Sequence, residues 1–221
     1  MKRSIGSVVA LLVVGLTSIP GMLWSAGGAS VPSTNPADQA ADAYSRGLGH
    51  RDKAWKLEEQ LESVSDPAKR SKLEAKVDKE YQKAIRAFRS AIEVNSTMYQ
   101  AHSSLGYALR KTGGYEASLA AYNQALQLEP GYAEAIEYRA EAFLGLNRIE
   151  DAKEAYLQLF RSDQERAEVL LAAMQRWVAE RDFAPQGLSG SVIDEFSAWV
   201  EERSAIAGHT ASREHSSDRT W

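Results

Sequence analysis

Apolar residues recur every three or four positions along most of the chain, from residue 36 to about residue 204. This spacing places them on one face of an α-helix, whereas a strand would require alternation. Pro36 and Pro67 stand at positions where a helix begins, and Asp66 precedes the second as an N-cap. The pattern therefore predicts an all-α fold that opens with two long helices, 36–63 and 67–94, joined by a tight turn.

The two long helices are expected to pair as a hairpin. Three apolar residues of the first can face three of the second, namely Leu57, Leu61 and Val64 against Leu73, Val77 and Tyr81. The hairpin is rich in both Lys and Glu, which is typical of a solvated surface supported by i,i+4 ion pairs. A dedicated docking arm is the alternative.

The apolar pattern repeats itself at a fixed offset, so that position i matches positions i+34 and i+68. Shifted copies align an aromatic column at Phe88, Tyr122 and Tyr156, and a small-residue column at Ala84, Ser118 and Ala152. Two further columns consist of Ala91, Ala125 and Leu159, and of Ile92, Leu126 and Phe160. A fixed period of this length indicates stacked helix pairs.

The stretch from Leu105 to Pro130 resembles the tetratricopeptide repeat (TPR), a helix-turn-helix unit. The resemblance is carried by Leu105-Gly106, the turn Thr112–Tyr115, and then Ser118, Tyr122, Ala125 and Pro130. Gly106 and Ala125 are small where the two helices must approach closely, and Tyr122 fills the space beside them. Residues 99–132 form one unit on this basis, and residues 133–166 form the next, with Ala140 for the glycine and Gln164 for the closing proline.

The resemblance implies a short right-handed TPR solenoid of about three helix pairs. The first unit, 36–98, is irregular because its candidate first helix lies much farther upstream than the repeat allows. Residues 167–206 are expected to form capping helices over the last repeat. Their predicted apolar faces are Val169, Leu170, Ala173, Met174, Trp177 and Val178, and then Val192, Phe196, Trp199, Val200 and Arg203. Residues 207–221 are expected to be a disordered tail.

Residues 1–29 have the pattern of a targeting segment. Lys2 and Arg3 precede an uncharged apolar run from Ile5 to about Trp24, and small residues follow. This predicts a secretory signal peptide, cleaved after Ala26 or Ala29, with an uncleaved membrane anchor as the alternative. Because the positive charge comes first, the repeats should face the periplasm, either free or anchored to the inner membrane. Residues 30–35 form a linker.

Charge is distributed unevenly along the chain, which has a formal net charge of −4. Residues 30–128 hold 14 basic and 12 acidic residues, whereas residues 129–202 hold 7 basic and 16 acidic ones. The net charge disfavours a nucleic-acid partner, and the acidic half suits a cationic or mixed-charge protein or simply keeps the chain soluble.

No catalytic or metal-binding constellation is evident. The chain has no cysteine, and its four histidines, His50, His102, His209 and His215, are scattered. We therefore expect no enzymatic activity, no metal and no cofactor.

A binding groove is what the resemblance implies instead. In the family, helix A residues line a concave surface that binds peptides or protein segments. The corresponding positions are Gln100, Ser103, Tyr107, Arg110 and Lys111 in the second unit, and Glu134, Glu137 and Glu141 in the third. Cations on one wall and carboxylates on the next suit an extended segment with both charges, with Tyr107 as an aromatic anchor.

The favoured interpretation is a non-enzymatic adaptor of the bacterial cell envelope that binds a peptide or protein segment in the TPR groove. The alternative is a structural assembly protein that oligomerises through the N-terminal hairpin or the C-terminal helix. The sequence leaves the identity of the partner open.

Overall fold

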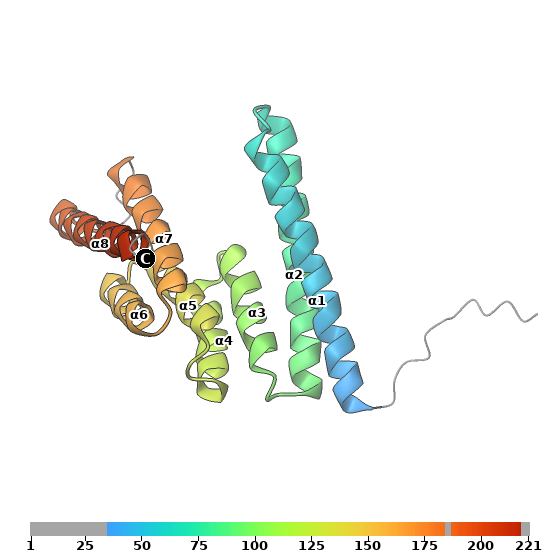
Figure 1. Ribbon diagram of the computed structural model, residues 1–221. Helices are drawn as coiled ribbons and strands as arrows, with labels where there is room; N and C mark the ends of the chain where they lie inside the picture. The colour runs from blue at the N-terminus through green and yellow to red at the C-terminus, as the bar shows by residue number, and fades with distance from the viewer. Residues whose placement is uncertain (1–34, 184–186, 218–221) are drawn as a thin grey trace, which may run out of the picture. The chain divides into compact units, whose positions relative to one another are not determined.

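The computed structural model describes residues 35–183 and 187–217, and within them it contains eight helices and no strand. The helices are α1 (Pro36–Glu62), α2 (Pro67–Val94), α3 (Tyr99–Lys111), α4 (Tyr115–Leu128), α5 (Ala133–Gly145), α6 (Ile149–Ser162), α7 (Gln164–Phe183) and α8 (Gly190–Ser217). Consecutive helices pack on one another from α1 to α8, as Figure 1 shows. The predicted all-α fold of stacked helix pairs is confirmed.

Both long helices begin as the sequence predicts. The side chain of Asn35 caps α1 by accepting a hydrogen bond from the Ala37 amide at 3.0 Å. Asp66 caps α2 by accepting from the Lys69 amide at 2.8 Å, so its predicted role is confirmed. Each cap satisfies an amide that has no partner within the helix.

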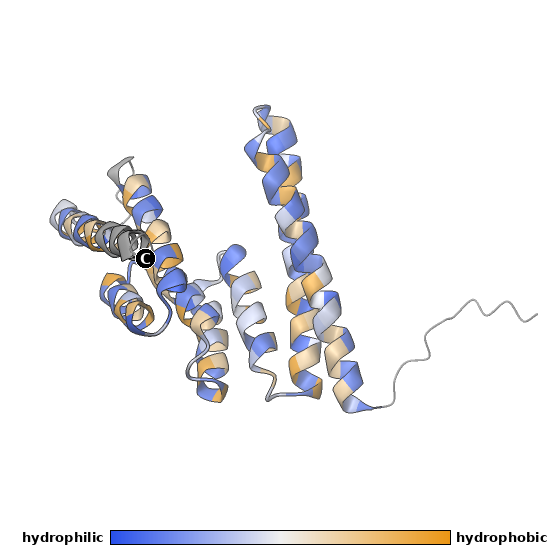
Figure 2. Cartoon of the chain, viewed as in Figure 1, coloured by the Kyte–Doolittle hydropathy of each residue, from blue (hydrophilic) through white to orange (hydrophobic). Residues whose placement is uncertain are grey.

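The predicted hairpin is also confirmed. Leu57 and Leu61 of α1 pack against the cluster that contains buried Val77 and Tyr81 of α2. The part of the hairpin nearest its turn is mostly hydrophilic, whereas apolar residues are more frequent in the half that packs on α3, as Figure 2 shows. The projecting end therefore has little apolar surface of its own to bury.

An insertion explains why the first unit looked irregular. Gly47 lies against the Phe88 ring in the way that Gly106 lies against the Tyr122 ring. The sequence numbers of Gly47 and Phe88 differ by 41, whereas those of Gly106 and Tyr122 differ by 16, so the first unit holds 25 additional residues. They lengthen both helices at the turn and leave the crossing between the helices unchanged.

The period of 34 predicted the core correctly. All three aromatic residues of the repeat column are buried, and so are the small residues of the neighbouring column. Side chains at equivalent repeat positions are therefore buried in the same way in successive helix pairs.

The two C-terminal helices cap the stack. For two residues, Val169 and Val192, the predicted position on the apolar face was wrong. Val169 is 45% exposed and Val192 is 38% exposed, whereas Leu171 and Ile193 are buried instead. The reason is that α7 packs against α5, α6 and α8, so neighbours on several sides decide which residues of its apolar surface are covered.

Helix α8 continues to Ser217, past the predicted end at residue 204, and so covers most of the segment 207–221 that was expected to be disordered. No proline interrupts this stretch. Among the described helices, none is long and apolar enough to span a bilayer. The predicted leader, 1–29, lies outside the described residues, as does all but Asn35 of the linker.

Candidate functional site

The eight predicted groove residues lie on α3 and α5, the first helices of the second and third units. Ser103 and Glu137 are each 2% exposed, so neither is freely available to a partner. The other six are half-buried or exposed, and Lys111 at the end of α3 is the most open of them. Their role in binding remains a prediction.

Most of the charges on this face pair with one another. Arg110 Nη1 lies 2.7 Å from Glu141 Oε2, which joins α3 to α5. Arg166 Nη1 lies 2.7 Å from Glu137 Oε2, and its Nη2 lies 4.0 Å from Glu134 Oε2, which joins α7 to α5. The cations and carboxylates that we expected a partner to meet are therefore partly neutralised within the chain.

Burial sets the electrostatics of these pairs. It raises the pKa of the Glu137 carboxyl, and the neighbouring Glu141 and Glu134 act in the same direction, while the hydrogen bond from Arg166 opposes them. Burial also raises the pKa of Tyr138, on the same face, to about 12, so its phenol is neutral near pH 7.

Tyr107 lies in an aromatic cluster that the hairpin completes. The indole Nε1 of Trp55 donates to the Tyr107 hydroxyl at 2.7 Å, and the two rings meet edge-on at 5.8 Å. Tyr138 of α5 lies on the other side of Tyr107, 5.0 Å between ring centroids. Glu58, from the same stretch as Trp55, pairs with Lys111 at 2.9 Å. Residues of the additional helical turns in the first unit, Trp55 and Glu58, therefore contact two of the predicted groove residues of the second unit, Tyr107 and Lys111.

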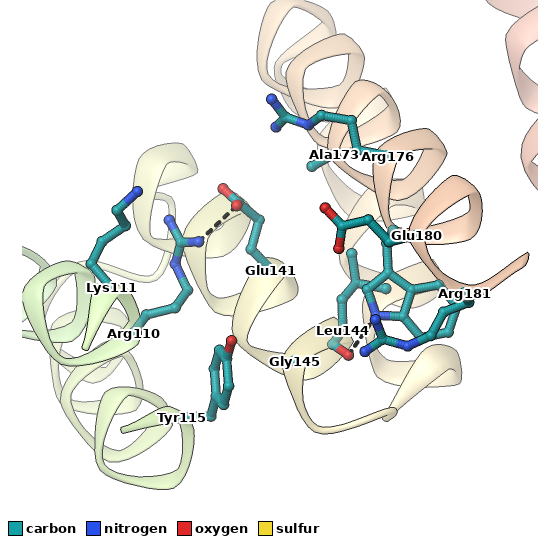
Figure 3. A pocket seen from close by; sticks show the side chains of 11 residues that line it. Arg110, Lys111, Tyr115, Glu141, Leu144, Gly145, Ala173, Arg176, Glu180 and Arg181 are labelled. Atoms are coloured by element: carbon teal, nitrogen blue, oxygen red, sulfur yellow. Dashed lines mark hydrogen bonds and ion pairs between the residues drawn. The ribbon is translucent and has the colours of Figure 1, made fainter. Parts of the chain in front are cut away.

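A pocket of about 540 Å³ opens between the C-terminal ends of α3 and α5 and the facing side of α7. Figure 3 shows the side chains of Lys111, Glu141, Arg176 and Glu180 directed toward the space between these helices. Its lining consists of Arg110, Lys111, Tyr115, Glu141, Leu144, Gly145, Ala173, Arg176, Trp177, Glu180 and Arg181. Three of the predicted groove residues therefore meet here: Arg110, Lys111 and Glu141.

The α7 side of this pocket was missed by the sequence analysis, which assigned α7 to capping alone. Trp177 Nε1 donates to the Leu144 carbonyl at 2.8 Å, and the Arg181 guanidinium lies 4.6 Å from the centre of the Trp177 ring. Arg176 and Glu180 are exposed beside them. A signal was available, because Ala167 stands one full period after Ala133 and the helix A positions continue into α7.

The lining of the pocket is chemically mixed. Guanidinium and ammonium groups lie beside carboxylates, and the largely buried side chains of Trp177 and Leu144 complete the lining. In the described part of the chain, no group of three or more His, Cys, Asp or Glu side chains could hold a metal ion.

Comparison with known proteins identifies one segment. Residues 99–132 match the family model described as tetratricopeptide repeat. No curated protein matches the chain.

Solved structures with a similar course of helices include the second TPR domain of human RPAP3 in complex with an HSP70 peptide. It is 18% identical, with a TM-score of 0.48, over 62% of this chain and 96% of that one. MamA is 15% identical, with a TM-score of 0.43, over 72% of this chain and 89% of that one. MamA from Desulfovibrio magneticus RS-1 is 17% identical, with a TM-score of 0.40, over 76% and 94%.

With identities of 15–18% and TM-scores of 0.40–0.48, these structures assign no function to the chain. The match at residues 99–132 coincides with α3 and α4, whose crossing brings Gly106 against Tyr122. The chain therefore contains a tetratricopeptide repeat at residues 99–132.

Proposed function

We propose that the chain is a non-enzymatic adaptor that binds an extended segment of another protein on the face formed by α3, α5 and α7. The observation that carries the proposal is the pocket between these helices, which is open to solvent and combines unlike charges with apolar surface. A segment that carries both acidic and basic residues fits such a lining. The cell envelope is the proposed location, on the strength of residues 1–29 alone.

The fixed and the free charges suggest how the segment is held. The Arg110–Glu141 pair is largely buried and acts as part of the wall. Arg176 and Glu180 are exposed on α7 and can pair with charged groups of a partner. Trp177 and Leu144 also line the pocket, but they are only 7% and 3% exposed, so the segment would be held mainly by its charged groups.

The test is capture of partners from a Gram-negative envelope with the wild-type chain and with Arg176→Glu/Glu180→Lys. The substitutions reverse two exposed charges one helical turn apart and leave the net charge unchanged. Asp42→Lys/Arg46→Glu on α1 is the matched control, since these residues are also exposed, oppositely charged and four apart. We expect a partner that the wild type and the control recover and the α7 variant loses. Recovery of the same partners by all three chains would exclude this pocket.

A further inference from the structure

The outward face of α2 is a basic ridge. Viewed along the helix, cations recur at spacings of four, three, four and three residues: Lys72, Lys76, Lys79, Lys83 and Arg86. All but Lys83 are exposed, and Lys83 forms an ion pair with Glu80. The opposite face of α2 carries the core residues, Tyr81 and Phe88 among them. The ridge therefore faces solvent along most of the helix.

At two repeat positions on this face, the residues change from basic to acidic along the chain. Lys83 of α2 corresponds to Ala117 of α4 and Asp151 of α6, each one period further along the chain. Arg86 corresponds in the same way to Ala120 and Glu154. At these two repeat positions the residue therefore changes from cationic in α2 through neutral in α4 to anionic in α6.

An acidic hollow lies at the anionic end. It has a volume of about 470 Å³ and is lined by Glu150, Asp151, Lys153, Glu154, Leu157 and Trp199. Lys153 pairs with Glu150 at 2.8 Å, and Arg148 pairs with Asp151 at 2.9 Å. Glu154 is exposed at its mouth. The ammonium group of Lys153 lies 5.7 Å from the centre of the Trp199 ring, so an incoming lysine would lay its aliphatic stem along Leu157 and bring its ammonium group to the exposed carboxylate of Glu154.

We propose that the basic ridge on α2 of one copy of this chain docks on the acidic hollow beside α6 of a second copy. The ridge cannot reach its own hollow, since α2 does not pack against α6 and the helices α3 to α5 come between them in the stack. Every copy of the chain carries both a ridge and a hollow, so the ridge of one copy can meet the hollow of another. A contact between two different surfaces of identical chains leaves one of each free, so it adds copies head to tail. It leaves the pocket between α3, α5 and α7 unused, so it stands or falls independently of partner binding there.

The test uses the full chain in a non-ionic detergent, which keeps the apolar segment near the N-terminus from causing association itself. Sedimentation velocity should show oligomers at about 20 mM salt and monomers at about 1 M, because salt screens exposed charges. Lys76→Glu/Lys79→Glu reverses the ridge, and Glu150→Lys/Glu154→Lys reverses the hollow. Each variant alone should be monomeric at low salt. Arg46→Glu/Lys56→Glu on α1 is the control for the ridge variant, with the same change in net charge at exposed positions, and it should associate like the wild type.

Mixing the two variants gives the decisive result. One copy then keeps an intact hollow and the other an intact ridge, so association should return in the mixture, and the charge-swapped ridge and hollow can also pair with each other. A carbodiimide, which joins amines to carboxylates in contact, should link Lys76 or Lys79 to Glu150 or Glu154 between isotopically distinct wild-type copies. A wild type that is monomeric at low salt overturns the proposal. So does a ridge variant that associates normally. Ridge-dependent binding to phosphatidylglycerol vesicles by a monomeric wild type would assign the ridge to a lipid surface instead.

Discussion

At the residue scale, each helix crossing depends on an aromatic ring that packs directly against a glycine or an alanine of the facing helix. A Cβ atom on Gly106 would lie 2.7 Å from Tyr122 Cε1, and the Tyr122 side chain is fully buried. Gly47 and Phe88 repeat this arrangement in the first unit. In the third unit, Ala140 takes the place of the glycine above Tyr156, and both are buried. The size of the residue under the ring therefore sets how closely each helix pair approaches.

Gly106→Ala should destabilise the chain by about 1–3 kcal/mol, because the buried ring cannot move aside without overpacking. Gly49→Ala is the matched control, since a Cβ there meets nothing within 4 Å in the same kind of helix. That substitution should stabilise the chain by roughly 0.5–1 kcal/mol through helix propensity. Urea denaturation measures both. Equal midpoints for the two variants would contradict this account of the crossing.

At the scale of elements, α7 is attached to α5 by a buried ion pair whose two partners differ in exposure. The Glu137 side chain is 2% exposed, whereas that of Arg166 is 35% exposed. Removing the arginine leaves a buried carboxylate without its partner, and removing the carboxylate leaves a cation that water can reach. The two deletions should therefore differ in cost.

Arg166→Ala should cost about 3–5 kcal/mol at neutral pH, the range for breaking a buried pair, and Glu137→Gln should cost less. Folding raises the pKa of Glu137 above its usual 4.5. The folded state therefore binds this proton more tightly, so stability falls as pH rises between 4.5 and the raised value. The penalty of Arg166→Ala should accordingly shrink as the pH falls through that range. Thermal unfolding of both variants between pH 4 and 7 tests this, and a penalty that does not change with pH argues against it.

The insertion in the first hairpin should be separable from the stack. Replacing residues 53–80 by Thr-Gly-Gly, the turn of the second unit, removes 25 residues in total and restores the period of 34. The replacement removes the buried residues Ala54 and Val77 at the same time, so neither is left in the chain without the other. The shortened chain should still unfold in one cooperative transition because Gly47 still meets Phe88. Non-cooperative melting, followed by circular dichroism, would show that the stack needs the longer hairpin.

At the scale of the whole molecule, two surfaces of opposite charge lie on different helix pairs, and the predicted leader precedes both. If the leader is a signal, expression in a Gram-negative host should yield a periplasmic chain that begins at Gly27 or Ser30. If it is an anchor, the intact chain should remain with the inner membrane. The intact mass of the protein from each fraction decides between these outcomes. A full-length chain in the cytoplasm would contradict export altogether.

Much of the fold could be predicted because repeat packing is periodic. The apolar columns at the period of 34 predicted Phe88, Tyr122 and Tyr156 as equivalent, and all three are buried. The starts of α1 and α2 could be predicted from Pro36, Asp66 and Pro67, since N-cap chemistry is local. The first helix pair was harder, because 25 additional residues lie between Gly47 and Phe88 and periodicity alone does not locate an insertion.

The candidate site could be predicted only in part. Arg110, Lys111 and Glu141 follow from the repeat register, but Trp55 and Glu58 come from the insertion, to which the register does not apply. The pairing of Arg166 with Glu137 also escaped prediction, since the two side chains are 29 residues apart in sequence and lie on different helices.

The sequence by itself determined the helices, their period and the columns of residues at each crossing, because these depend on neighbours one helical turn or one repeat away. Only the tertiary structure decided which charges remain free for a partner. Arg110 and Glu141 neutralise each other, whereas Arg176 and Glu180 stay exposed, and that difference arises where α3, α5 and α7 meet. The physical reason is that an ion pair requires a distance of a few ångströms between side chains, and packing between helices sets that distance.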